Sequence, residues 1–179
     1  MKKTWRILGA VAALTLGACT GGGDEGEGGN GGGTGSCTGT FSGAVTASVG
    51  TCSVSAVKIP STGQLQFTIK LTPATGTSIT RASSVILTVL GDAKTATYSG
   101  ADFKEGLGTI ETASTDYELQ IITGSQTLGS ATLTIDSVPT GTPVGDRTNY
   151  EGFGGNAQIK FVPSSGTGEV NLALTFKRS

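Results

Sequence analysis

The chain has 179 residues, a formal net charge of −1 at pH 7 and no histidine. The missing histidine excludes Ser-His-Asp triads, Cys-His pairs and the HExxH zinc motif. Only 14% of the residues are charged, and the chain after residue 18 contains no basic run that could displace counterions from nucleic-acid phosphates. We therefore expect no nucleic-acid partner.

The first 18 residues combine a basic start with a short apolar stretch. The basic residues Lys2, Lys3 and Arg6 lie at the start of the chain, and a largely apolar stretch of ten residues, 7–16, follows. A membrane-spanning helix needs about 20 apolar residues, so this stretch is too short to cross a bilayer. The pattern is typical of a signal peptide that is cleaved after export.

The sequence Leu16-Gly17-Ala18-Cys19 follows directly. It resembles the lipobox of bacterial lipoproteins, in which Leu stands three positions before a cysteine and two small residues intervene. The resemblance implies lipid on the thiol of Cys19 and cleavage just before it. Two or three acyl chains anchor a protein stably, so we expect a membrane location. Thr20 follows in place of Asp, which implies the outer membrane and leaves open which side the domain faces. The alternative is an ordinary secretory signal with a cysteine after its cleavage site.

Glycine dominates the next segment, residues 19–36. Ten glycines lie between positions 21 and 35, among Asp24, Glu25 and Glu27. Such a segment has no side chains that can pack and is typical of a flexible linker. The three acids lack the spacing of an EF-hand, so we expect a solvated tether rather than a calcium site.

Two cysteines, Cys37 and Cys52, remain for the exported domain, residues 37–179. An even number of cysteines in an oxidising compartment predicts a disulfide. The alternative is a redox or metal pair, but the spacing is not CxxC and no histidine could complete a zinc site. The disulfide would close a loop of about 15 residues and stabilise the fold by roughly 3 kcal/mol.

The domain sequence alternates between apolar and polar residues with a period of two. The clearest alternating runs are 65–71, 117–121, 131–135, 157–161 and 170–176. About eight or nine short strands with frequent turn signals predict an all-β fold, a single antiparallel β-sandwich that could be immunoglobulin-like, with a small barrel as the alternative. Residues 85–90 are apolar at both parities. They predict either a central strand or a short buried helix, and their β-branched content favours the strand.

Paired carboxylates are one catalytic chemistry that the composition allows. The candidates are Asp102, Glu105, Glu111, Asp116 and Glu118. Glycosidases hold two such groups roughly 5–10 Å apart in a cleft. These acids stand in turns or alternate with apolar strand residues, so we interpret them as solvated. We expect no enzyme activity, no cofactor and no metal, and a hydrolase remains a remote alternative.

The segment 145–156 has the composition of a recognition loop. It carries Arg147, Asn149, Tyr150 and Phe153 between glycines. Exposed aromatic rings beside Arg and Asn are typical of binding surfaces. The competing interpretation is a connection whose Tyr150 or Phe153 fills the end of the core. The sequence thus favours an anchored protein with a structural, adhesive or protein-binding role, and the alternative is a small-molecule or glycan-binding module that uses this loop.

Overall fold

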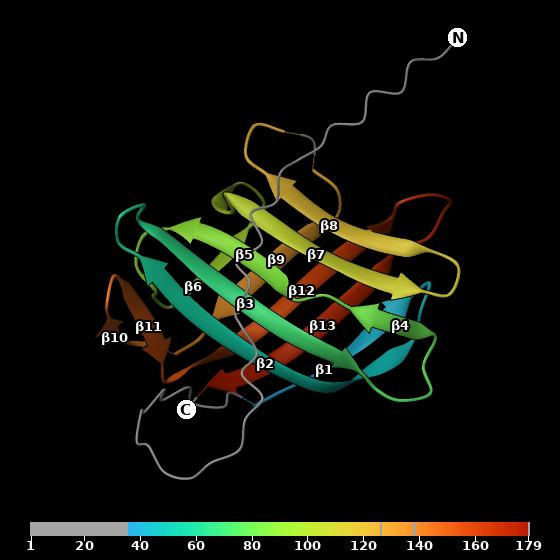
Figure 1. Ribbon diagram of the computed structural model, residues 1–179, viewed down its shortest axis with the longest axis horizontal. Coiled ribbons are helices and arrows are strands. Elements are labelled where there is room, and N and C mark those ends of the chain that lie inside the picture. The colour runs from blue at the N-terminus through green and yellow to red at the C-terminus, as the bar shows by residue number, and fades with distance from the viewer. Residues whose placement is uncertain (1–35, 126, 138, 179) are drawn as a thin grey trace, which may run out of the picture. The chain divides into compact units, whose positions relative to one another are not determined.

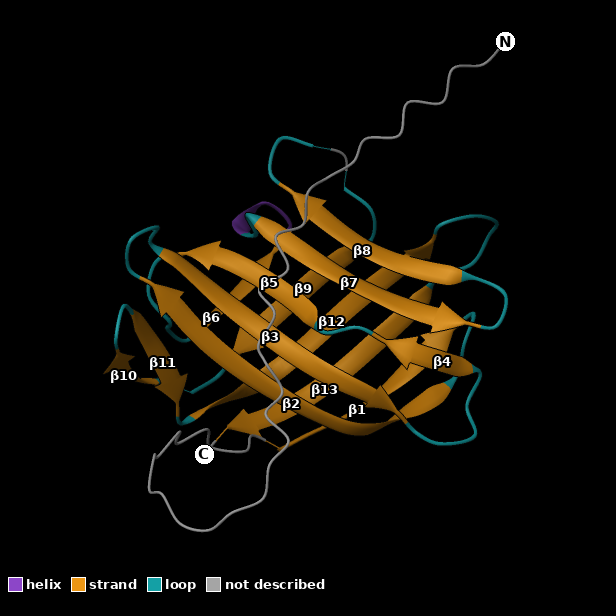
Figure 2. Cartoon of the chain, viewed as in Figure 1, coloured by secondary structure: helices purple, strands orange, loops and turns teal. Residues whose placement is uncertain are grey.

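The computed structural model describes residues 36–125, 127–137 and 139–178. The expected signal peptide (1–18), the lipidation residue Cys19 and tether residues 20–35 lie outside the described residues. Thirteen strands and one short 3-10 helix make up the described part, which contains no α-helix (Figure 2). The prediction of an all-β fold is confirmed.

The strands follow one another along the chain with short connections. Their bounds are β1 Ser36–Gly43, β2 Ala47–Ile59, β3 Gln64–Pro73, β4 Ile79–Ala82, β5 Val85–Leu90, β6 Ala96–Ser99, β7 Glu105–Thr112, β8 Asp116–Ile122, β9 Ser130–Ile135, β10 Thr140–Val144, β11 Arg147–Glu151, β12 Phe153–Pro163 and β13 Val170–Arg178. The 3-10 helix η1, Gly100–Asp102, joins β6 to β7. The segment 85–90, ambiguous in the sequence, is strand β5.

Every strand pairing is antiparallel, and eight strands close on themselves in the order β1-β13-β12-β8-β7-β5-β3-β2. The closing contact joins β2 back to β1 through the pairs Thr40↔Ser48 and Phe41↔Ala47. Two layers face each other (Figure 1): β2, β3, β5, β7 and β8 form one, and β6, β9, β12, β13 and β1 form the other. We call the second one the back layer.

The layers are joined because two long strands change partners along their length. β2 pairs with β1 near its start and with β11 near its end. β12 pairs with β9 along residues 155–160 and with β8 at Val162 and Pro163. The antiparallel part of the prediction is therefore confirmed. The structure differs from the expected sandwich of two separate sheets, because eight strands form one closed sheet to which further strands are added. Alternation within single strands is the same in both architectures, so it does not distinguish them.

The expected strand number was too low because several short strands carry little signal. β10 is exposed at all five positions and so shows no alternation, whereas β4 and β6 have four residues each. β6 and β4 gain their backbone hydrogen bonds from strands distant in sequence, β9 and β7, whereas β10 pairs with the next strand in the chain, β11.

Large side chains of the inward parity fill the space between the layers. All six phenylalanines and all three tyrosines of the chain are buried there. They are Phe41, Phe67, Tyr98, Phe103, Tyr117, Tyr150, Phe153, Phe161 and Phe176. No phenyl or phenol ring of this protein is left on the outer surface to act as a stacking platform.

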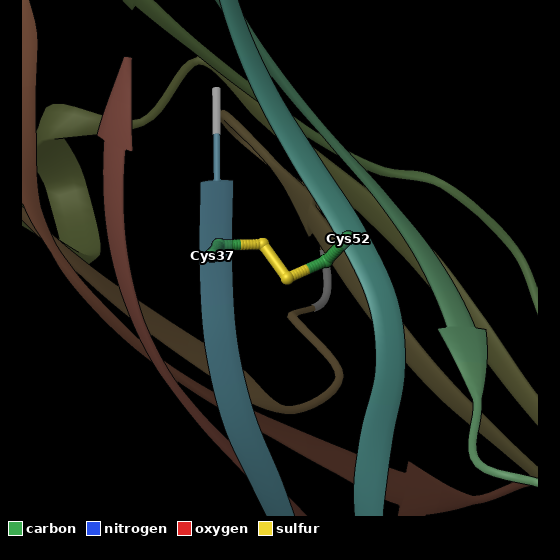
Figure 3. Close-up of a disulfide and its surroundings, with 2 residues drawn as sticks. All are labelled: Cys37 and Cys52. Carbon is green, nitrogen blue, oxygen red and sulfur yellow. A yellow bond between two sulfur atoms is a disulfide. The ribbon is translucent and has the colours of Figure 1, made fainter. Parts of the chain in front are cut away.

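The Cys37–Cys52 disulfide forms as predicted and links β1 to β2 (Figure 3). The two Cα atoms lie 5.5 Å apart, and both residues pack against the core. The bridge lies beside the short hydrogen-bonded contact between β1 and β2, so it reinforces the place where the sheet closes.

Candidate functional site

The segment 145–156 is not a loop. It forms β11 and the start of β12, and β10 and β11 make a hairpin in which Val144 pairs with Arg147. Gly145 (φ 62°) and Gly152 (φ 67°) provide the left-handed conformations at the two turns. These two glycines, which suggested a recognition loop in the sequence, instead mark strand boundaries, while Gly154 and Gly155 lie inside β12.

Both rings of this segment face the core. Tyr150 is 7% exposed and Phe153 is 1% exposed. The ring of Phe153 packs edge-on against Phe67 and Phe176, with centroids 6.4 and 6.1 Å away. Their burial agrees with the interpretation that these rings fill the core. Arg147 is exposed and Asn149 is half-buried, so the four residues share a region but do not form one surface.

An ion pair lies near the tip of Tyr150. Lys58 on β2 donates a hydrogen bond to Asp92, and this bond holds the pKa of the Asp92 carboxyl below its usual value. A hydrogen bond from Tyr150 lowers the pKa of Asp92 further, by a smaller amount. The contact with Asp92 also raises the pKa of Lys58. The pair is open to solvent, and we assign it no chemistry beyond local charge balance.

None of the carboxylates considered for hydrolysis is buried, and two of them, Glu111 and Asp116, stand opposite each other in the β7–β8 register. Asp102 accepts a hydrogen bond from the backbone N–H of Ser99 at 2.8 Å, within a turn, and Glu111 contacts Arg81 at 3.5 Å. Within the described ranges, no group of three or more acidic or cysteine side chains could hold a metal ion. No helix among the described residues is long and apolar enough to cross a membrane.

The outer surface of the back layer carries the most regular array of polar side chains. The strand register aligns outward residues of β6, β9, β12, β13 and β1 in three cross-strand rows. The first row is Thr97, Thr134, Asn156, Thr175 and Thr38; the second is Ser99, Thr132, Gln158, Ala173 and Thr40; the third is Ser130, Lys160, Asn171 and Ser42. We call these residues the polar face.

The side chains of the polar face point away from the core, and almost all of them are uncharged. All of its residues except Ala173 and Lys160 are Ser, Thr, Asn or Gln, and none is buried. Rows lie about 7 Å apart along the strands and neighbouring strands about 4.8 Å apart, which gives a dense lattice of hydroxyl and amide groups. Thr97 and Thr134 share a hydrogen bond of 3.1 Å across two of these strands.

A depression of about 340 Å³ lies in the middle of this face. Its floor includes Ala173, whose methyl group stands in the second row between the longer side chains of Gln158 and Thr40. The rim is formed by Thr38, Thr40, Asn156, Gln158 and Thr175, all of which are exposed. Beneath it, β1 lies close to β13, since a Cβ at Gly39 would stand 2.4 Å from the carbonyl oxygen of Ala173.

A second depression, of about 270 Å³, adjoins the first. Gln158 lines both of them, and Ser130, Thr132 and Asn171 line the second one. At its far end, Lys160 and Glu169 form an ion pair at 2.8 Å. The hydrogen bond from Lys160 holds the pKa of Glu169 below its usual value, and Asn171 adds to this lowering.

The polar face is not evident from the sequence alone. Its residues include the polar halves of the alternating runs, such as Gln158 and Lys160 within 157–161. Such residues ordinarily serve only to solvate the outer side of a sheet. The strand register was needed to show that five polar strands lie side by side.

Comparisons with protein-family models, curated proteins and solved structures give no match to this chain.

Proposed function

We propose that this protein is an exported lipoprotein, anchored to a membrane through Cys19, with a non-enzymatic adhesive or partner-binding role. We further propose that it binds through the polar face. The observation that carries this proposal is the alignment of hydroxyl and amide side chains from five adjacent strands into one nearly uncharged surface with two joined depressions.

Three features support export and anchoring. The basic start and short apolar stretch match an export signal, and Leu16-Gly17-Ala18-Cys19 resembles a lipobox. The Cys37–Cys52 disulfide suits the oxidising compartments outside the cytosol. Thr20 after the lipidated cysteine favours the outer membrane, and the glycine-rich tether gives the domain roughly 20–25 Å of reach from the lipid.

The scaffold suits a binding role because it holds the polar face rigidly. Each strand of that face except the short edge strand β6 is paired on both sides, so the backbone positions are fixed before a partner arrives. A fixed surface loses little conformational entropy on binding. The inward sides of the same strands carry Phe41, Leu133, Ile159 and Phe176, which tie the face to the core.

Replacement of Cys19 by alanine is expected to abolish membrane retention. Without the thiol no lipid can be added, so the full-length variant should remain as uncleaved precursor or appear in the soluble fraction. Fractionation of cells followed by mass analysis of the amino terminus measures both. Thr34→Ala, in the tether, is the control, because it leaves both the lipobox and the Cys37–Cys52 disulfide intact. Retention of the Cys19→Ala variant in the membrane, in an amount equal to the wild type, would refute the anchor.

Introduction of a charge on the polar face is expected to weaken adhesion. Gln158→Glu places an unpaired carboxylate between the two depressions, and an unpaired charge covered by a partner costs enough to weaken binding at least about tenfold. Attachment and aggregation of cells that display the full chain are the measurement. Thr72→Glu, at an exposed position of β3 in the other layer, is the control. Equal attachment of wild-type and Gln158→Glu cells would show that this face does not mediate adhesion.

A further inference from the structure

We propose, on the basis of the proposed function, that the polar face binds a neutral glycan chain laid across its two depressions. The ligand class is an uncharged polysaccharide or oligosaccharide of several sugar units. The inference depends on three observations: the make-up of the first depression, its continuity with the second one, and the cancellation of charge at the end of the site.

The first depression offers the two kinds of contact that a sugar ring requires. A pyranose presents a small C–H surface and a rim of hydroxyl groups. The methyl group of Ala173 provides an apolar floor, and the exposed side chains of Thr38, Thr40, Asn156, Gln158 and Thr175 surround it. The three threonine hydroxyls and the two amides both donate and accept hydrogen bonds, as sugar hydroxyls do.

The second depression makes the site longer than one sugar. Gln158 lies on the shared border, where its amide can bond to units on either side. From there the site continues past Thr132 and Asn171 toward Lys160. A linear chain of sugars therefore fits this arrangement better than a single small molecule in a closed cavity.

The charge within the three rows favours a neutral chain, while the exposed Lys177 lies one row beyond Thr175 on β13. Lys160 is the only charged residue of the three rows, and its ammonium group is paired with Glu169 at 2.8 Å. Recognition of carboxylated or sulfated glycans requires unpaired Arg or Lys groups, because each anionic group must be compensated. Here an anionic glycan would have to compete with Glu169 for Lys160.

The affinity of one such site is expected to be low. All phenylalanine and tyrosine rings are buried, so none of these rings can stack on the sugar. Display of many copies on one membrane compensates for this, since multivalent attachment raises the apparent affinity by roughly 10²–10⁴-fold. A weak site on a lipid-anchored, tethered domain is thus a coherent arrangement for adhesion.

The test uses the full-length protein, purified in detergent and applied to an immobilised array of neutral glucans, mannans and xylans together with acidic polyuronates. The neutral glycan with the strongest signal is then titrated against variants. Gln158→Ala removes the shared amide and should weaken binding roughly tenfold. Ala173→Ile fills the floor with a side chain that strands accept, and should abolish detectable binding. Gln66→Ala, on the outer side of β3 in the other layer, should leave binding unchanged. Thermal unfolding of each variant checks that the fold is retained.

The outcomes separate the ligand class from the adhesive role. Absence of binding to every neutral glycan, binding only to the polyuronates, or binding unchanged in both Gln158→Ala and Ala173→Ile would overturn the glycan inference. If cell attachment still falls in Gln158→Glu cells, the proposed adhesive function stands and its partner has another chemistry. If attachment is also unchanged, both proposals fail together.

Discussion

Replacement of Phe153 by alanine is expected to lower the free energy of unfolding by about 3–5 kcal/mol, the usual cost of truncating a fully buried phenylalanine. The ring lies at the centre of an aromatic group, with Phe67 and Phe176 packed edge-on at 6.4 and 6.1 Å. Removal of the ring exchanges these contacts for a cavity that the surrounding strands cannot close, because the sheet is closed on itself. Urea denaturation followed by circular dichroism is the measurement.

The control for this experiment is Arg147→Ala in the same segment. Arg147 is exposed, and its contact with Asp146 spans 3.9 Å at the surface. Its truncation is expected to change the free energy of unfolding by no more than about 0.5 kcal/mol. Comparison of the two stability losses shows whether the segment 145–156 is packed into the core or forms an exposed recognition loop. A loss below about 1 kcal/mol for Phe153→Ala would contradict the burial on which the structural account of this segment depends.

Removal of the Cys37–Cys52 disulfide is expected to lower the free energy of unfolding by about 3 kcal/mol. The bridge closes a loop with a sequence separation of 15 and so restricts the unfolded chain. It also lies close to the contact between β1 and β2, which share only two paired positions. The bridge therefore holds these two strands together covalently beside a short hydrogen-bonded contact. The Cys37→Ser/Cys52→Ser double variant and the reduced wild-type protein should lose the same stability in urea titrations.

Hydrogen exchange shows where the effect of the bridge falls. β1 pairs with β13 over eight positions, whereas its contact with β2 is short. Without the bridge, we expect faster exchange in β1 and the first half of β2, and unchanged exchange in β7 and β8. Uniform acceleration over all strands, or a stability loss below about 1 kcal/mol, would show that the bridge does not support the closure of the sheet.

The outcome for Tyr150 and Phe153 shows why a polar, glycine-rich segment can be misread. In the sequence, the glycines around 145–156 are typical of a loop, and aromatic residues in loops are typical of binding sites. Gly145 and Gly152 are turn residues, whereas Gly154 and Gly155 lie inside β12. The ring of Tyr150 points into the core because β11 pairs with β2, nearly a hundred positions earlier in the chain. The composition of the segment 145–156 does not predict that pairing.

The polar face could not be predicted from the sequence because it depends on which strands are neighbours. Threonines and amides at alternate positions predict a solvated strand surface, and that reading of each single strand agrees with the structure. What single strands do not reveal is that β9, β12, β13 and β1 are neighbours, or that Ala173 stands between Gln158 and Thr40. A depression depends on the relative lengths of side chains in adjacent strands, and these are set by the register.

The sequence by itself determined the all-β class, the antiparallel pairing, the inward parity of most strands and the Cys37–Cys52 disulfide, because alternation, composition and cysteine count are local or additive properties of a chain. It also contains the signal for the anchor at Cys19, which remains a prediction. Only the tertiary structure decided the closure of the sheet, the burial of Tyr150 and Phe153 and the assembly of the polar face. These depend on which distant strands pair, and that choice reflects the combined packing of the whole core rather than the preference of any one segment.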